Sequence, residues 1–266
     1  MNILEMRALY DEDQRKAIEY PDMRRDVQPM VVRHIDTSGG GEGTIVYSRL
    51  NETNVDEAIR EQVAYFEGIG QDFEWKVYDY DHPADLKDRL GSHGFAVGED
   101  EAIMVLDLEE ARTTLWQPVH ADVRRILSAE RIWDVLTVER QVWDEDFTGL
   151  ARYLGDSLRN YSEQMSIYVA YANGEPASTA WIYFPKHSQF ASLWGGSTVD
   201  AFRKQGLYTA LLAMRAQEAR RRQVRYLTVD ARPMSRPILE KYGFEVIGHS
   251  FPCRWKSRSR NQSVTA

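Results

Sequence analysis

The stretch VDAFRKQGLYTALL, residues 199–212, begins with two cations and ends as an apolar helix. A helix start normally carries Ser, Thr, Asp or Asn as its N-cap, with acidic residues in the first turn. Here Arg203 and Lys204 stand where carboxylates are favoured, and Gly206 precedes the apolar run. On its own this turn also fits a solvated basic loop. The free N–H groups and dipole of a helix start attract phosphate, however, so we expect a pyrophosphate or another phosphate ester to bind here.

The segments around this turn have the pattern of a strand, a helix and a returning strand. Apolar periodicity predicts a strand over 189–199, a long helix over 206–222 and a second strand over 224–231. Gly195 and Gly196 interrupt the first strand, and glycines there often mark a bulge or a close backbone approach. A bulged strand that splays from its parallel neighbour would open a slot for an extended ligand. The turn has the form of neither GxxxxGK[ST] nor GxGxxG, so the familiar nucleotide loops are not expected.

The composition is that of an ordinary globular protein. The 266 residues are 43% hydrophobic, which is enough for one large domain or two small ones, and the net charge of −8 argues against a dedicated nucleic-acid binder. Cys253 is the single cysteine, no apolar run reaches the length of a membrane span, and the first twenty residues are too acidic for a signal peptide. The six histidines have no metal-ligand spacing. We therefore expect a cytoplasmic protein with no metal, no nucleic-acid partner and no membrane association, whose oligomeric state, monomer or homodimer, stays open.

The order of the expected elements repeats between the two halves of the chain. Each half reads strand, helix, strand, short helix, Gly-Phe and strand, with the Gly-Phe pairs at 94–95 and 243–244. A repeat of this length suggests duplicated domains, although βαβα order is also common by chance. The first half has no counterpart of the basic turn, because Asp56 and Glu57 occupy the start of its helix and would repel a phosphate. We place a degenerate domain at 1–112 and a ligand-binding domain at 113–266.

Two motifs together resemble the GNAT superfamily of N-acetyltransferases. The run from Arg203 to Tyr208 matches the family's [QR]-x-x-G-x-[GA] loop, which binds the pyrophosphate of acetyl-CoA, except that Tyr208 replaces the small last residue. The segment RPMSRPILEKYGF, residues 232–244, matches the end of the family's N-x-x-A-x-x-L-Y-E-K-x-G-F helix. The resemblance covers about residues 120–255. It implies an α/β fold with a mixed, centrally splayed β-sheet flanked by helices, present as two domains in tandem.

The resemblance also implies which residues bind acetyl-CoA, the co-substrate. Backbone groups of the strand end would contact pantetheine and the thioester, and the turn would wrap the pyrophosphate. The residues expected to do so are Ser197, Thr198, Val199, Arg203, Lys204, Gln205, Gly206, Leu207, Tyr208 and Thr209.

The catalytic residues are harder to assign. Many family members protonate the leaving thiolate with a tyrosine of the motif helix, but that position here is Leu239, and the family's asparagine position is Arg232. Tyr242 lies on another face of the same helix, so the role does not transfer to it directly. Asp230 ends a strand on the side where ligands usually bind parallel sheets, which makes it a candidate base, although such carboxylates often cap a turn. Asp230 and Tyr242 remain candidates.

Three functions are compatible with these motifs. The first is an N-acetyltransferase that moves an acetyl or short acyl group from acetyl-CoA to a primary amine of a small molecule or peptide, by direct attack in a ternary complex. The second is a non-catalytic acyl-CoA-binding or regulatory module, which Leu239 would suit. The third is an aminoacyl transferase that uses charged tRNA, against which the acidic charge and the acetyl-CoA-type loop argue.

Overall fold

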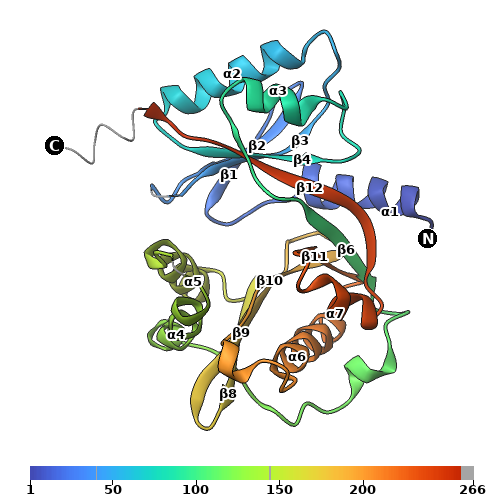
Figure 1. The fold of residues 1–266 in the computed structure, drawn as a ribbon, viewed down its shortest axis with the longest axis vertical. Helices are drawn as coiled ribbons and strands as arrows, with labels where there is room; N and C mark the ends of the chain where they lie inside the picture. The colour runs from blue at the N-terminus through green and yellow to red at the C-terminus, as the bar shows by residue number, and fades with distance from the viewer. Residues whose placement is uncertain (40, 144, 259–266) are drawn as a thin grey trace, which may run out of the picture. The chain divides into compact units, whose positions relative to one another are not determined.

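The computed structural model describes residues 1–39, 41–143 and 145–258, which form two compact units (Figure 1). The first unit comprises Met1–Ile103, Asp230–Met234 and Val246–Ala266, and the second comprises Met104–Val229 and Ser235–Glu245. The sequence pattern predicted one boundary between residues 112 and 113, whereas both compact units are discontinuous in sequence.

The last strand accounts for most of this difference. Strand β12 (Glu245–Trp255) pairs antiparallel with β4 (Phe73–Tyr78) of the first unit, from Ser250↔Tyr78 to Trp255↔Phe73. Its Cys253 is fully buried in the hydrophobic core of that unit. Sequence order alone assigned this strand to the second domain, but its ladder bonds and buried side chains belong with the first unit.

The first unit combines a mixed sheet with helices. Its strands lie in the order β1-β2-β3-β4-β12, and only the β3–β4 pair among them is parallel. Helices α2 and α3 lie together on one side of these strands (Figure 1), and α2 buries Ile59 and Phe66 against the core. Its elements, besides β4 and β12, are α1 (Ile3–Tyr10), a π-helix (Asp11–Lys16), β1 (Met23–Val27), β2 (Val31–Asp36), β3 (Gly43–Ser48), α2 (Val55–Gly68), α3 (Leu86–Ser92) and β5 (Ala96–Val97).

The second unit has the same kind of architecture. Its strands follow the order β11-β10-β9-β8-β7, in which β10 and β11 are parallel and the other pairs antiparallel. Helices α4 and α5 lie on one side of these strands and α6 on the other (Figure 1). Its elements are η2 (Thr113–Trp116), β7 (Asp122–Ile126), η3 (Ala129–Arg131), α4 (Ile132–Val142), α5 (Thr148–Asn160), β8 (Met165–Ala172), β9 (Glu175–Tyr183), β10 (Phe190–Thr198), η4 (Asp200–Phe202), α6 (Leu207–Arg221) and α7 (Arg236–Lys241).

Two strands run from one unit into the other. These are β6 (Glu101–Asp107) and β11 (Tyr226–Ala231). The expected mixed α/β fold, with a sheet flanked by helices, is confirmed. Across the described residues, none of the helices combines the length and the apolar character that crossing a membrane requires.

Candidate functional site

Strand β10 separates from its parallel neighbour part-way along its length. The parallel pairs join Phe190–Ser192 to Tyr226–Thr228 and then stop, although β10 continues to Thr198. On its other edge β10 stays paired with β9, with a bulge between Trp194 and Ser197. The bulge that Gly195 and Gly196 predicted is therefore present, and the edge of β10 beyond it has no strand partner among the described residues.

The two bulge glycines make room for aromatic rings. A Cβ atom on Gly195 would lie 1.8 Å from the ring of Trp181, and one on Gly196 would lie 2.8 Å from the ring of Tyr208. Gly195 also adopts a φ of +62°, which side chains disfavour. Tyr208, which departs from the family pattern, thus packs its ring against the bulge.

The basic turn adopts an unusual backbone conformation before α6 begins. Lys204 and Gly206 have φ values of +61° and +81°, and Gly206 is the N-cap of α6. No side chain caps this helix start, and its first turn contains no acidic residue. The first N–H groups of α6 are therefore oriented toward the turn with no capping side chain, as anion binding requires.

The two cations of the turn differ in their surroundings. The Arg203 guanidinium forms an ion pair with Asp200 at 2.7 Å and donates from Nε to the carbonyl of Thr198 at 3.3 Å. Lys204 has no such partner in the described part of the chain and is exposed. Lys204 is thus the cation that remains available to an incoming anion.

The other expected ligand-binding residues continue this arrangement. The Val199 N–H donates to the carbonyl of Ala177, and Thr209 donates its hydroxyl to the carbonyl of Gly206, which closes the turn. Gln205 bonds back to Ala201, and Leu207 is buried under the turn. The predicted residues thus form one continuous path from the end of β10 to the first turn of α6.

A buried carboxyl that no sequence motif indicated lies beside this path. Glu139 on α4 is 4% exposed, and its Oε2 accepts a hydrogen bond from the Ser197 hydroxyl at 3.1 Å. The pKa of Glu139 is raised to about 7, mainly by burial and also by the charge of Glu145, while hydrogen bonding from Ser197 and Trp143 opposes the shift. The sequence does contain one signal that could have identified Glu139, because a glutamate stands beside the buried residues Val135 and Val138 of an amphipathic helix.

The two catalytic candidates from the sequence are placed differently. Asp230, within the first unit, is paired with Lys76, whose pKa its charge raises against the opposing effect of burial. Tyr242 caps the end of α7, and Leu239 on that helix is fully buried. An ion-paired carboxylate is poorly available as a base, so the structure gives no support to Asp230 in that role.

The first unit has a similar splayed strand pair, but its own chain occupies the bulge. Strands β3 and β4 pair in parallel only over Gly43–Ile45 and Phe73–Trp75, and the β2–β3 ladder is irregular next to Val46. Arg15, 1% exposed, donates from Nε to the Val46 carbonyl at 2.9 Å. Its guanidinium also bonds Asp11 and Asp81 and lies 3.9 Å from the centre of the Tyr78 ring.

The start of α2 likewise differs from that of α6. Asp56 in its first turn is hydrogen-bonded to Arg89 at 2.8 Å and to His93 at 3.1 Å, and these contacts lower its pKa. This carboxylate therefore has a structural role, and a phosphate at the same helix start would meet negative charge.

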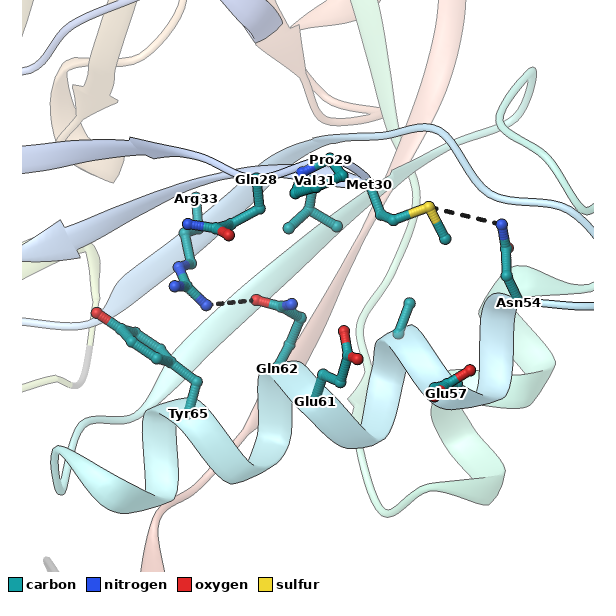
Figure 2. A pocket seen from close by; sticks show the side chains of 11 residues that line it. Gln28, Pro29, Met30, Val31, Arg33, Asn54, Glu57, Glu61, Gln62 and Tyr65 are labelled. Carbon is teal, nitrogen blue, oxygen red and sulfur yellow. Dashed lines mark hydrogen bonds between the residues drawn. The ribbon is translucent and has the colours of Figure 1, made fainter.

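A cavity of about 440 Å³ lies in the first unit, between α2 and the β1–β2 turn (Figure 2). Arg33 on its wall bonds Gln62 at 3.0 Å and Asp26 at 2.8 Å, and its guanidinium lies 3.4 Å from the centre of the Tyr65 ring. The Arg33 guanidinium is already paired with Asp26 and stacked on the Tyr65 ring. The cavity therefore offers no phosphate site comparable to the turn before α6.

The region that contains this path matches a known protein family. A family model described as an acetyltransferase (GNAT) domain matches residues 137–255, which include β10, the turn and α6. Residues 137–255 are a GNAT acetyltransferase domain. No curated protein matches it in sequence.

Solved structures extend the fold similarity to both halves of the chain. A GCN5-related N-acetyltransferase from Kribbella flavida has a TM-score of 0.66 at 14% identity, covering 88% of this chain and 89% of that one. A functionally unknown conserved protein from Staphylococcus epidermidis has a TM-score of 0.66 at 12% identity, covering 90% and 96%. A tandem GNAT protein from the clavulanic acid biosynthesis pathway has a TM-score of 0.60 at 12% identity, covering 90% and 84%. The GNAT fold therefore spans nearly the whole chain.

The matched domain gives the general chemistry, which is that of an acyl-CoA-dependent N-acyltransferase. Within the described ranges, no three His, Cys, Asp or Glu side chains come together as metal ligands would.

Proposed function

We propose that the second unit binds acetyl-CoA, or another short acyl-CoA, and transfers the acyl group to a primary amine of a small molecule or peptide. The observation that carries this proposal is the end of the parallel pairs at Ser192, after which β10 leads to the uncapped start of α6. An extended thioester needs such an open strand edge, and a pyrophosphate needs such a helix start.

Two parts of this path would bind different parts of the acyl-CoA. Those backbone groups of Ser197, Thr198 and Val199 that the fold leaves unpaired would hold pantetheine and the thioester, and residues 203–209 would surround the pyrophosphate. The open space at Gly206, where an added Cβ would meet only the Thr209 hydroxyl at 3.7 Å, supports a close approach of the ligand to the backbone. The amine attacks the thioester carbonyl directly in a ternary complex, and a strand N–H stabilises the oxyanion.

A second candidate is a non-catalytic acyl-CoA-binding module. Leu239, at the position of the family's tyrosine, is fully buried and has no proton to donate. A thiolate, with a pKa of about 8.5 for an ordinary thiol, leaves without much assistance, so we favour the enzyme.

The degenerate copy of a tandem pair would then be the domain at about 1–112, whose sheet β12 completes, and the acyl-CoA domain would lie within about 113–266. Arg15 at the first unit's bulge supports a structural role for that half, because its guanidinium takes the place an extended ligand would need. We further propose that the protein acts in the cytoplasm, as a monomer or homodimer, without a nucleic-acid or membrane partner.

Two measurements test the proposal. Calorimetric titration with CoA measures binding, and thiol release from acetyl-CoA across a panel of primary amines, with mass spectrometry of the products, measures transfer. We expect one CoA per chain and acetylated product with at least one amine. Binding without turnover on any amine would favour the module, and the absence of CoA binding would refute both functions.

A further inference from the structure

The carboxyl of Glu139 has one satisfied and one unsatisfied oxygen. Its Oε2 accepts from the Ser197 hydroxyl at 3.1 Å, and that same hydroxyl oxygen accepts from the Trp143 indole N–H at 3.1 Å. Its Oε1 is buried and has no hydrogen-bond partner in the described part of the chain. Buried polar atoms are nearly always partnered, so an orphaned carboxylate oxygen calls for a group that arrives from outside.

Glu139 lies next to the segment of β10 along which the acyl donor is proposed to bind. Helix α4 packs on β9 and β10, and Ser197 is the first residue of β10 that pairs again with β9 after the bulge. Ser197 also begins the segment that the proposed function assigns to the thioester. Glu139 is thus one hydrogen bond away from the strand segment along which the acyl group would lie.

We propose that Glu139 is the general base of the transfer, and that its unpartnered Oε1 takes the proton from the ammonium form of the acceptor. This inference rests on the proposed function, because it needs an acyl-CoA along β10. It goes beyond that function in naming the residue that takes the proton from the acceptor amine.

The proton and electron balance is complete without a further reagent. The acceptor ammonium loses one proton to Glu139, and the nitrogen lone pair then forms a bond to the thioester carbonyl carbon. The carbon–sulfur bond breaks, with its electron pair leaving on the CoA sulfur, and the nitrogen loses its second proton. One of the two protons ends on the thiolate and the other returns from Glu139 to solvent, which gives an amide, a thiol and one released proton.

The surroundings of Glu139 suit this role near neutral pH. Burial is the main cause that raises its pKa, to about 7, so the carboxylate form is present at neutral pH and still accepts a proton readily. The groups that act on it are the Ser197 hydroxyl from β10, the Trp143 indole from the end of α4 and the Glu145 carboxylate from the loop that follows. On α4 itself the nearby Arg140 lies 5.3 Å from the centre of the Trp133 ring.

The test compares two nucleophiles that differ in their need for a base. A simple alkylamine such as ethylamine is protonated at neutral pH, whereas hydroxylamine is largely neutral. With ethylamine, Glu139→Gln is expected to lower kcat/KM by about 10²- to 10⁴-fold, the usual range for a lost general base, while hydroxylamine turnover stays within a few-fold. CoA affinity by calorimetry is expected to be unchanged, and the exposed Glu110→Gln serves as the matched control for both assays.

The pH profile gives an independent readout. In the wild type, kcat/KM for ethylamine is expected to fall as the pH drops through about 7, and this limb should disappear in Glu139→Gln. Glu145→Gln should move the limb to lower pH, because the charge that helps raise the pKa of Glu139 is removed.

Each other outcome contradicts the inference in a recognisable way. An equal loss with both nucleophiles would make Glu139 a structural residue of the bulge, and no loss with either would remove it from the reaction. A wild type that binds CoA but acetylates neither these two nucleophiles nor any amine of the panel would refute both the base and the transfer. A wild type that does not bind CoA would refute the proposed function at its first step.

Discussion

Replacement of Gly206 by alanine, together with a control glycine, separates the strain of the left-handed backbone conformation from the effect on CoA binding. The residue has φ +81° and ψ 3°, a left-handed conformation that costs an L-residue about 1–2 kcal/mol. The added Cβ would meet only the Thr209 hydroxyl, at 3.7 Å, which is an ordinary contact, so backbone strain is the whole expected cost in stability. The same methyl group stands where a pyrophosphate would approach the backbone, so CoA affinity should fall by at least about tenfold, or about 1.4 kcal/mol.

Gly174→Ala is the matched control. Gly174 lies in the β8–β9 turn with φ +84°, and a methyl group added there would have no atom within 4 Å, so it carries the same strain away from the proposed site. Chemical denaturation should give similar losses of stability for the two variants, and calorimetry with CoA should give a loss of affinity for Gly206→Ala alone. Wild-type affinity in folded Gly206→Ala would refute the reasoning, as would an equal loss of affinity in both variants.

Three further predictions follow from the contacts of charged residues. Lys204→Ala should weaken CoA binding by about tenfold and Arg203→Ala by less, because Arg203 is already paired with Asp200, and calorimetry of the two variants would check the order. The pKa of Glu139 is higher in the folded than in the unfolded protein, so its contribution to stability should be lost as the pH rises from 4.5 to about 7. In denaturant titrations, the free energy of unfolding of the wild type relative to Glu139→Gln should fall by up to about 3 kcal/mol across this window. A difference that does not change with pH would contradict the burial argument. Asp230→Asn should lower the free energy of unfolding by about 3 kcal/mol, because it leaves the Lys76 charge without its partner. CoA affinity and acyl transfer should stay at wild-type values. A selective loss of activity would restore Asp230 as a catalytic candidate.

Much of the second unit could be predicted from local sequence signals. Asn173 and Gly174, with φ values of 54° and 84°, form the turn between β8 and β9 that the Asn-Gly pair predicts. The long helix expected over 206–222 is observed as Leu207–Arg221, with Gly206 as its N-cap. These features depend on residues that lie close together in sequence, so periodicity and turn chemistry were enough.

The features that were missed depend on distant parts of the chain. Strand β12 reads as the last strand of the second half, and nothing local reveals that Ser250–Trp255 pair with β4. Glu139 belongs to no motif, and its importance arises only because α4 brings it to Ser197, far along the chain. Arg15 likewise reads as a solvated residue of an amphipathic helix until the fold places it at the Val46 carbonyl. Such roles come from tertiary contacts that one sequence does not encode locally.

The strand pairing of the two units follows the same pattern as the repeat in the sequence. In the first unit Gly43–Ile45 pair in parallel with Phe73–Trp75, and in the second Phe190–Ser192 pair with Tyr226–Thr228, and in both units the parallel pairing then ends. The short helices that follow end before Gly94 and Gly243, which have φ values of +90° and +97°. These parallels support the proposed duplication.

A crystal structure of the protein with acetyl-CoA is the most direct test of this account. It should contain one acetyl-CoA per chain, with the pyrophosphate on the backbone amides of 204–209 and the thioester beside Ser197, within reach of the Glu139 carboxyl. A pyrophosphate bound at the start of α2 in the first unit, or a thioester remote from the β10 bulge, would contradict it.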